Sequence, residues 1–215
     1  MTKGKETLIE VGNWVWTLFS INVIWFLLNF PVILTVILIF SMPFGLPFVA
    51  FTVVLILMIT IFTIPSLAGV FSAIGQWKER GSGTYIKYVL RTWIKEVKSI
   101  VPNLIEGSII GLIVIMIKAF EGNIFVSTLV LVWGLLTTLV VIANAYLKGL
   151  NKDDDLTQFI IQHGGQLLVS TILFVIMIAL NGYLKLAFLI LICSISFSAL
   201  VTVNLLNKKS SYRKL

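Results

Sequence analysis

The fold is decided by one long uncharged stretch, residues 11–77, VGNWVWTLFSINVIWFLLNFPVILTVILIFSMPFGLPFVAFTVVLILMITIFTIPSLAGVFSAIGQW. As a single helix its 67 residues would be about 100 Å long, whereas the hydrocarbon core of a bilayer is about 30 Å thick. Two prolines and a glycine within residues 41–47 predict where the chain folds back, because both residue types end helices. We therefore expect one membrane span at about residues 13–40 and a second at about residues 48–75.

The rest of the chain continues this pattern. Of its 215 residues, 59% are hydrophobic and 12% are charged, against roughly 45–50% and about 25% in soluble domains. This composition excludes a soluble globular enzyme, and the absence of ten-residue alternation excludes an outer-membrane barrel. We expect an all-α, polytopic transmembrane bundle of about six helices in the lipid bilayer, forming a single domain over residues 1–215. The four further apolar segments are at 100–117, 124–147, 166–181 and 184–206.

The positive charges predict an orientation. With six spans, both termini and the connections at 76–99 and 148–165 share one side of the membrane and contain 14 of the 16 Lys and Arg residues. The opposite side contains two, Lys118 and Lys185. By the positive-inside rule we expect both termini in the cytoplasm. The net charge of +7 then faces anionic lipid, and nucleic acid is not an expected partner.

A basic amphipathic helix is predicted over residues 84–98, between the second and third spans. Its apolar residues, Trp93 among them, recur at helical spacing, while Lys87, Arg91 and Lys95 fall on the other side. Such a helix is suited to the plane of the lipid headgroups. We favour a lipid anchor, because basic interfacial helices are common beside spans. The alternative is a docking surface for a cytoplasmic partner such as a transporter ATPase.

The first predicted span contains polar residues. Asn22 and Trp25 share one helical face, and Asn29 precedes Pro31. An intramembrane Asn is unfavourable unless it has a partner, so we expect Asn22 and Asn29 to bond to other helices, at roughly 0.6–2 kcal/mol for each bond. The alternative function for these amides is contact with a polar substrate.

Small and acidic residues mark the second and third spans. Pro65 and Gly69 lie in a run of small residues that favours close helix approach. The third span contains Asn103, Glu106 and Gly107, followed by a further glycine four residues later. Glu106 is the only acidic residue within a predicted span. Intramembrane ionisable groups are functional candidates, but its shallow position favours a structural or interfacial role, including pairing with a nearby base such as Lys98 or Arg91.

The sequence offers no candidate for catalysis. The single cysteine, Cys193, excludes an internal disulfide, and one histidine, His163, leaves no set of metal ligands. The acidic run 153–155 has no calcium-loop spacing and is more typical of a helix cap. We therefore expect no cofactor, no metal site and no enzymatic activity.

Two motifs carry a family resemblance. Trp14-x3-Leu18-x3-Asn22-x2-Trp25, together with Pro65-Ser-Leu-Ala-Gly-Val-Phe71 and Trp77-Lys78, resembles the YesL-like family of bacterial membrane proteins. The similarity covers about residues 14–30 and 65–111. The resemblance implies a non-enzymatic multi-pass protein of a bacterial cell membrane, because the family has no assigned catalytic activity and no active-site residues. Members of this family are typically encoded beside bacterial sugar importers.

Two functions remain open at this point. The resemblance implies an accessory or regulatory membrane protein associated with a carbohydrate ABC-type uptake system, with permease subunits as possible partners. The alternative is a small-molecule-binding or permeating subunit of an importer, which would require Asn22, Asn29 and Glu106 to converge on one polar pocket. The basic, aromatic connection at 76–99 does not resemble the acidic coupling loop of ABC permeases, which disfavours direct coupling to an ATPase.

Overall fold

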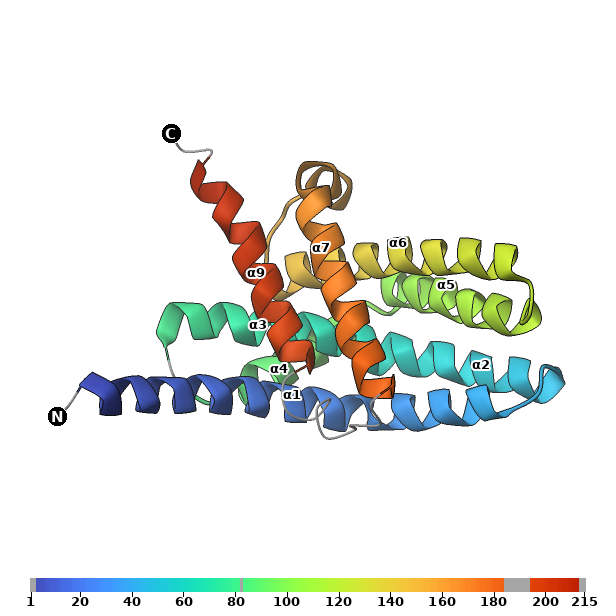
Figure 1. Ribbon diagram of the computed structural model, residues 1–215, viewed down its shortest axis with the longest axis horizontal. Coiled ribbons are helices and arrows are strands. Elements are labelled where there is room, and N and C mark those ends of the chain that lie inside the picture. The colour runs from blue at the N-terminus through green and yellow to red at the C-terminus, as the bar shows by residue number, and fades with distance from the viewer. Residues whose placement is uncertain (1–2, 82, 184–193, 213–215) are drawn as a thin grey trace.

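The computed structural model describes residues 3–81, 83–183 and 194–212, and every regular element in those residues is helical (Figure 1). This confirms the all-α fold. The elements are α1 (Lys3–Ser41), α2 (Leu46–Met58), the π-helix η1 (Ile59–Thr63), α3 (Ile64–Arg80), α4 (Ile86–Val97), α5 (Ile100–Ala119), α6 (Ile124–Gly149), α7 (Leu156–Tyr183) and α9 (Ser194–Tyr212).

Five helical segments are long and apolar enough to cross a membrane, and the chain is a membrane protein. They are Glu10–Ser41, Leu46–Arg80, Ile100–Ala119, Ile124–Gly149 and Leu156–Leu180. They correspond to the first five predicted spans. Of the sixth, predicted at 184–206, residues 184–193 lie outside the described part of the chain, and the remainder belongs to α9.

The predicted fold-back between the first two spans is present. α1 ends at Ser41, and α2 begins at Leu46 with Pro47 in its first turn. Proline is tolerated there because the N–H groups of a first turn have no partner within the helix. From this turn, α1 and the continuous α2–η1–α3 segment run back along each other, as Figure 1 shows.

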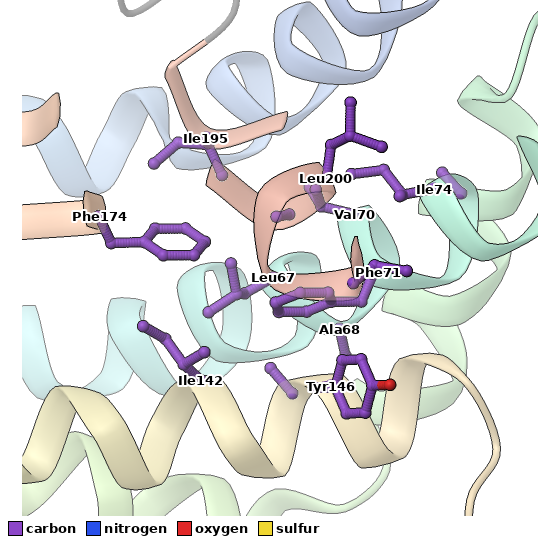
Figure 2. Packing of buried hydrophobic residues seen from close by; sticks show 14 of the residues in the cluster. Leu67, Ala68, Val70, Phe71, Ile74, Ile142, Tyr146, Phe174, Ile195 and Leu200 are labelled. Atoms are coloured by element: carbon purple, nitrogen blue, oxygen red, sulfur yellow. The ribbon is translucent and has the colours of Figure 1, made fainter. Parts of the chain in front are cut away.

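Two hydrophobic clusters divide the bundle. In Figure 1, α1, the α2–η1–α3 segment, α5 and α6 follow the long axis, while α7 and α9 cross that axis steeply. The larger cluster joins α1, α3, α4, α6, α7 and α9. Figure 2 shows Phe71 next to Tyr146 within it, and the centroids of these two rings are 5.7 Å apart. The smaller cluster joins α1, α2 and η1, with α5 packed against it. Ile110 on α5 packs against both clusters.

Helix α4 packs antiparallel to α3. Its Tyr88 hydroxyl accepts a hydrogen bond from Arg80 at 2.8 Å, and Val89 lies against Gly69, further back along α3. A Cβ atom at Gly69 would lie 2.6 Å from the Val89 carbonyl oxygen, so only glycine permits this approach. The basic amphipathic helix is thus present where predicted, with one face bound to the bundle and the other exposed.

Glycine also brings α5 against the second span. A Cβ atom at Gly107 would lie 2.7 Å from Thr60 Oγ1, and one at Gly111 would overlap Ile56. Both glycines are buried. Small residues on α5 therefore place its polar side chains beside η1.

Candidate functional site around the break in the second span

The second span is continuous, but its α-helical hydrogen-bonding pattern changes at η1, just before Pro65, and we call this place the break. Proline has no N–H, so Pro65 cannot donate the usual α-helical hydrogen bond to the carbonyl oxygen of Ile61, four residues earlier. The indole Nε1 of Trp93 on α4 donates to that oxygen at 2.9 Å. The Trp93 ring also stacks on Phe62, with 6.2 Å between centroids and 13° between planes. The side chain of Trp93 therefore replaces the missing backbone donor and attaches α4 to the break.

Asn29 binds the same break from α1. Its Nδ2 donates to Ser66 Oγ at 2.9 Å, and its Oδ1 accepts from Thr63 Oγ1 at 2.7 Å. The Asn29 side chain also donates to the Trp25 carbonyl oxygen of its own helix at 2.9 Å. With Asn29 only 1% exposed, these bonds satisfy a polar group that lipid could not solvate.

On the α5 side of the break lies a group of five residues, which we call the polar cluster: Glu96, Asn103, Glu106, Asn144 and Lys148. Asn103 is fully buried, its Nδ2 donates to the Glu96 carbonyl oxygen at 3.0 Å, and its Oδ1 accepts from Lys148 Nζ at 3.2 Å. The same Nζ lies 3.9 Å from Glu96 Oε2, so the Glu96 carboxylate, with 8% of its side chain exposed, has a cation beside it. A buried charge is tolerated where it is paired in this way.

Glu106 lies about one turn further along α5 than Asn103 and extends the polar cluster toward α6. Asn144 Nδ2 on α6 donates to Glu106 Oε1. Glu106 Oε2 is buried and has no hydrogen bond within the described residues. The base suggested by the sequence, Lys98 or Arg91, is not its hydrogen-bond partner in the described structure. The hydrogen-bond partner of Glu106 is instead Asn144, which is 38 residues away in the chain.

The polar cluster opens into a small pocket. Its volume is about 300 Å³, and Glu96, Asn144 and Lys148 contribute to its wall together with Asp153 and Asp154 from the α6–α7 connection. This volume lies at the lower end of the range for small-molecule sites. Within the described residues, no group of three or more His, Cys, Asp or Glu side chains has the arrangement of a metal site.

Asn22 holds the start of α9. Its Oδ1 accepts from the backbone N–H groups of Ile195 and Ser196, both at 3.1 Å, and Ser196 Oγ donates to the Leu18 carbonyl oxygen at 2.9 Å. An amide from α1 therefore serves as the N-cap of another helix. Trp25, one turn further along α1, packs against the larger cluster, and its Nε1 has no hydrogen bond within the described part of the chain.

The residues predicted for a partner or lipid surface divide into two groups. Trp93 is bound to the break, whereas Lys87 and Arg91 are exposed. Lys95 is also exposed, and its Nζ donates to Asn151 Oδ1 at 3.0 Å. The exposed side of α4 therefore contains the basic residues, whereas the Trp93 indole packs against the second span.

Sequence reasoning missed three members of the polar cluster: Glu96, Asn144 and Lys148. One signal was available, because Asn144 and Lys148 are four residues apart and share a face of α6. The sequence contains no such signal for Glu96, because an acidic residue in a basic amphipathic helix usually lies on its solvent-exposed face.

Comparisons with protein-family models, curated proteins and solved structures find no match to this chain. The YesL-like resemblance therefore remains a prediction from the quoted motifs.

Proposed function

We propose that this protein is a non-catalytic accessory subunit of a bacterial carbohydrate ABC-type importer, which binds and regulates the permease within the membrane. The resemblance to the YesL-like family supports the carbohydrate context. The polar contacts within the bundle support an accessory role over a permeating one.

The observation that carries this proposal is the use of the intramembrane amides. Asn22 binds α9, Asn29 binds the second span and Asn103 binds Lys148. A permeating subunit needs polar side chains that can turn toward a passing substrate. Here the three amides hold helices together, which favours a rigid scaffold.

The direct test is purification of the tagged full chain from its native host in a mild detergent after gentle crosslinking. We expect sugar-permease subunits, identified by mass spectrometry, in a fixed ratio to the chain. An unrelated tagged polytopic protein of similar size serves as the control. Migration of the chain alone, or equal permease recovery with the control, would refute the proposal.

The alternative, a small-molecule-binding subunit, is favoured by one observation. Glu106 Oε2 is buried without a hydrogen bond within the described residues, and its partner Asn144 lines the 300 Å³ pocket. Thermal unfolding with a panel of mono- and oligosaccharides tests this alternative. Stabilisation of the unmodified protein that is lost in Glu106→Gln would support a binding subunit and displace the scaffold proposal.

A further inference from the structure

A basic pocket lies between α3 and α4, on the side that faces the end of α6. Its volume is about 630 Å³, within the range of sites that bind small molecules. The side chains that define it are Gln76, Arg80, Tyr88, Arg91, Lys95 and Asn151. It contains three cations, and its lining includes no carboxylate.

Two of these cations are held in place. Arg80 donates to the Tyr88 hydroxyl at 2.8 Å and lies 5.7 Å from the centre of that ring. Lys95 donates to Asn151, and the nearest carboxylate oxygen to its Nζ, Glu96 Oε1, is 3.9 Å away. Positioned cations lose little side-chain freedom when an anion binds.

The third cation, Arg91, makes no hydrogen bond or ion pair with any described residue. At the rim, Glu79 accepts from Gln76 at 3.1 Å, so one carboxylate lies near the pocket without lining it. A guanidinium whose donors are not used by the described residues is suited to a phosphate group.

An apolar groove adjoins the basic pocket. It follows α4 along the stripe of Ile86, Leu90 and Ile94, next to the basic residues Lys87 and Arg91, and has a volume of about 710 Å³. Ile94 is 56% exposed and Ile86 is 37% exposed. Arg91 lines both the groove and the basic pocket. A ligand centred on Arg91 would therefore meet cations on one side and aliphatic side chains on the other.

We propose that this composite site binds an anionic phospholipid, with the phosphate and headgroup in the basic pocket and an acyl chain along Ile86, Leu90 and Ile94. A free phosphate or an acidic peptide would use the cations but would leave the groove exposed to water. In a membrane protein, a basic pocket beside an apolar groove matches the two chemical parts of such a lipid. This inference is independent of the proposed role in sugar uptake.

The first test compares lipids on the unmodified full chain in detergent. Thermal unfolding and native mass spectrometry are measured with dioleoyl-phosphatidylglycerol, with dioleoyl-phosphatidylcholine and with inorganic phosphate. We expect the anionic lipid to bind more tightly and to raise the unfolding temperature further than the zwitterionic lipid. Equal binding of the two lipids would overturn the proposal. Competition by inorganic phosphate at the concentrations at which the lipid binds would show a free-anion pocket instead.

The second test uses a charge-matched pair of variants. Removal of Arg91, as Arg91→Gln, should weaken phosphatidylglycerol binding roughly fivefold, because each cation near the headgroups contributes about 1 kcal/mol. The control Lys98→Gln removes an exposed cation at the end of α4 that lines neither the basic pocket nor the groove. Equal weakening in the two variants would indicate attraction to net charge alone and would refute a defined site.

A third variant tests the acyl-chain part of the site. Ile86→Ser with Ile94→Ser, at the two exposed apolar positions of the groove, leaves every cation in place. It should reduce affinity for phosphatidylglycerol while the protein in detergent alone unfolds near its usual temperature. Unchanged affinity would show that the groove does not contact the lipid.

Discussion

The indole Nε1 of Trp93 lies 2.9 Å from the carbonyl oxygen of Ile61, and the residue four positions after Ile61 is a proline. A helix outside the second span thus supplies the donor that the span lacks. Breaks of this kind in membrane helices are tolerated only where protein groups satisfy the freed backbone. Helix α4 is therefore part of the folded bundle, and its docking and the break in the second span depend on each other.

Replacement of Trp93 by Phe should lower the stability of the protein if α4 and the break depend on each other. Phe keeps a ring to stack on Phe62 but removes the N–H that donates to the Ile61 carbonyl, and we expect this loss to cost about 1–3 kcal/mol. Thermal or denaturant unfolding in detergent measures the loss. Trp133→Phe, at an exposed position on α6, is the matched control and should be nearly neutral.

A double-mutant cycle tests the reason for that loss. In a Pro65→Ala background, an N–H becomes available at position 65 for the Ile61 carbonyl, so Trp93→Phe should have a smaller effect than in the unmodified protein. Strict additivity of the two substitutions would contradict the proposed exchange of donors.

Gly69→Ala should separate α3 from α4. The new methyl group would lie 2.6 Å from the Val89 carbonyl oxygen, which is backbone and cannot rotate away. We expect a destabilisation of about 1–3 kcal/mol, typical of overpacking. Gly12→Ala is the control, since a Cβ atom there meets nothing within 4 Å. In that control, helix propensity alone acts and favours alanine by up to about 1 kcal/mol. A lower free energy of unfolding in Gly69→Ala, together with a higher one in Gly12→Ala, would verify the contact.

Asn22→Ala should loosen the start of α9. Without the Asn22 Oδ1 acceptor, the N–H groups of Ile195 and Ser196 lose their cap, and we expect a loss of about 0.5–2 kcal/mol. Hydrogen–deuterium exchange provides a local readout, because those two amides should exchange faster than in the unmodified protein. Asn13→Ala, on the exposed part of α1, should leave their exchange unchanged.

Alkaline pH should weaken the α3–α4 connection through Tyr85. Burial raises the pKa of its phenol above the ordinary value of 10.0, the neighbouring Tyr88 raises it further, and Arg80 lowers it. The folded state thus favours the protonated phenol. Its stabilising contribution is complete below pH 10 and is lost as the pH rises through the raised pKa.

The corresponding measurement is unfolding stability as a function of pH in the unmodified protein and in Tyr85→Phe. The unmodified protein should lose more stability above pH 10 than the variant, since only it has this phenol to ionise. Parallel pH profiles would show that Tyr85 is not the group responsible.

Hydropathy was sufficient to predict most of the fold. The five described spans were predictable because hydropathy within a segment and the breaks at residues 41–47 are local properties of the chain. The basic helix before α5 was predictable for the same reason. Its contact with α3 was not, because amphipathicity indicates that a helix has two faces without indicating which surface each one meets.

For single polar residues, the sequence indicates that a partner is needed but not which residue supplies it. Glu106 and Asn29 stood out in the sequence as polar groups in apolar segments, and the need for partners followed from the cost of burying them. The identity of those partners did not follow. Asn144 is 38 residues from Glu106, Ser66 is 37 from Asn29, and Trp93 is 32 from Ile61.

The amino-acid sequence by itself therefore determined that this protein is a helical membrane bundle, where its spans lie and which buried groups require a hydrogen bond. These properties depend on the transfer of each segment from water to lipid, which neighbouring residues decide. Only the tertiary structure decided which helix supplies each bond and where Arg80, Arg91 and Lys95 gather around one pocket. These contacts depend on how whole helices are rotated and how closely they approach each other. Gly69 and Gly107 determine the approach of their helices by their small size, which hydropathy does not reveal.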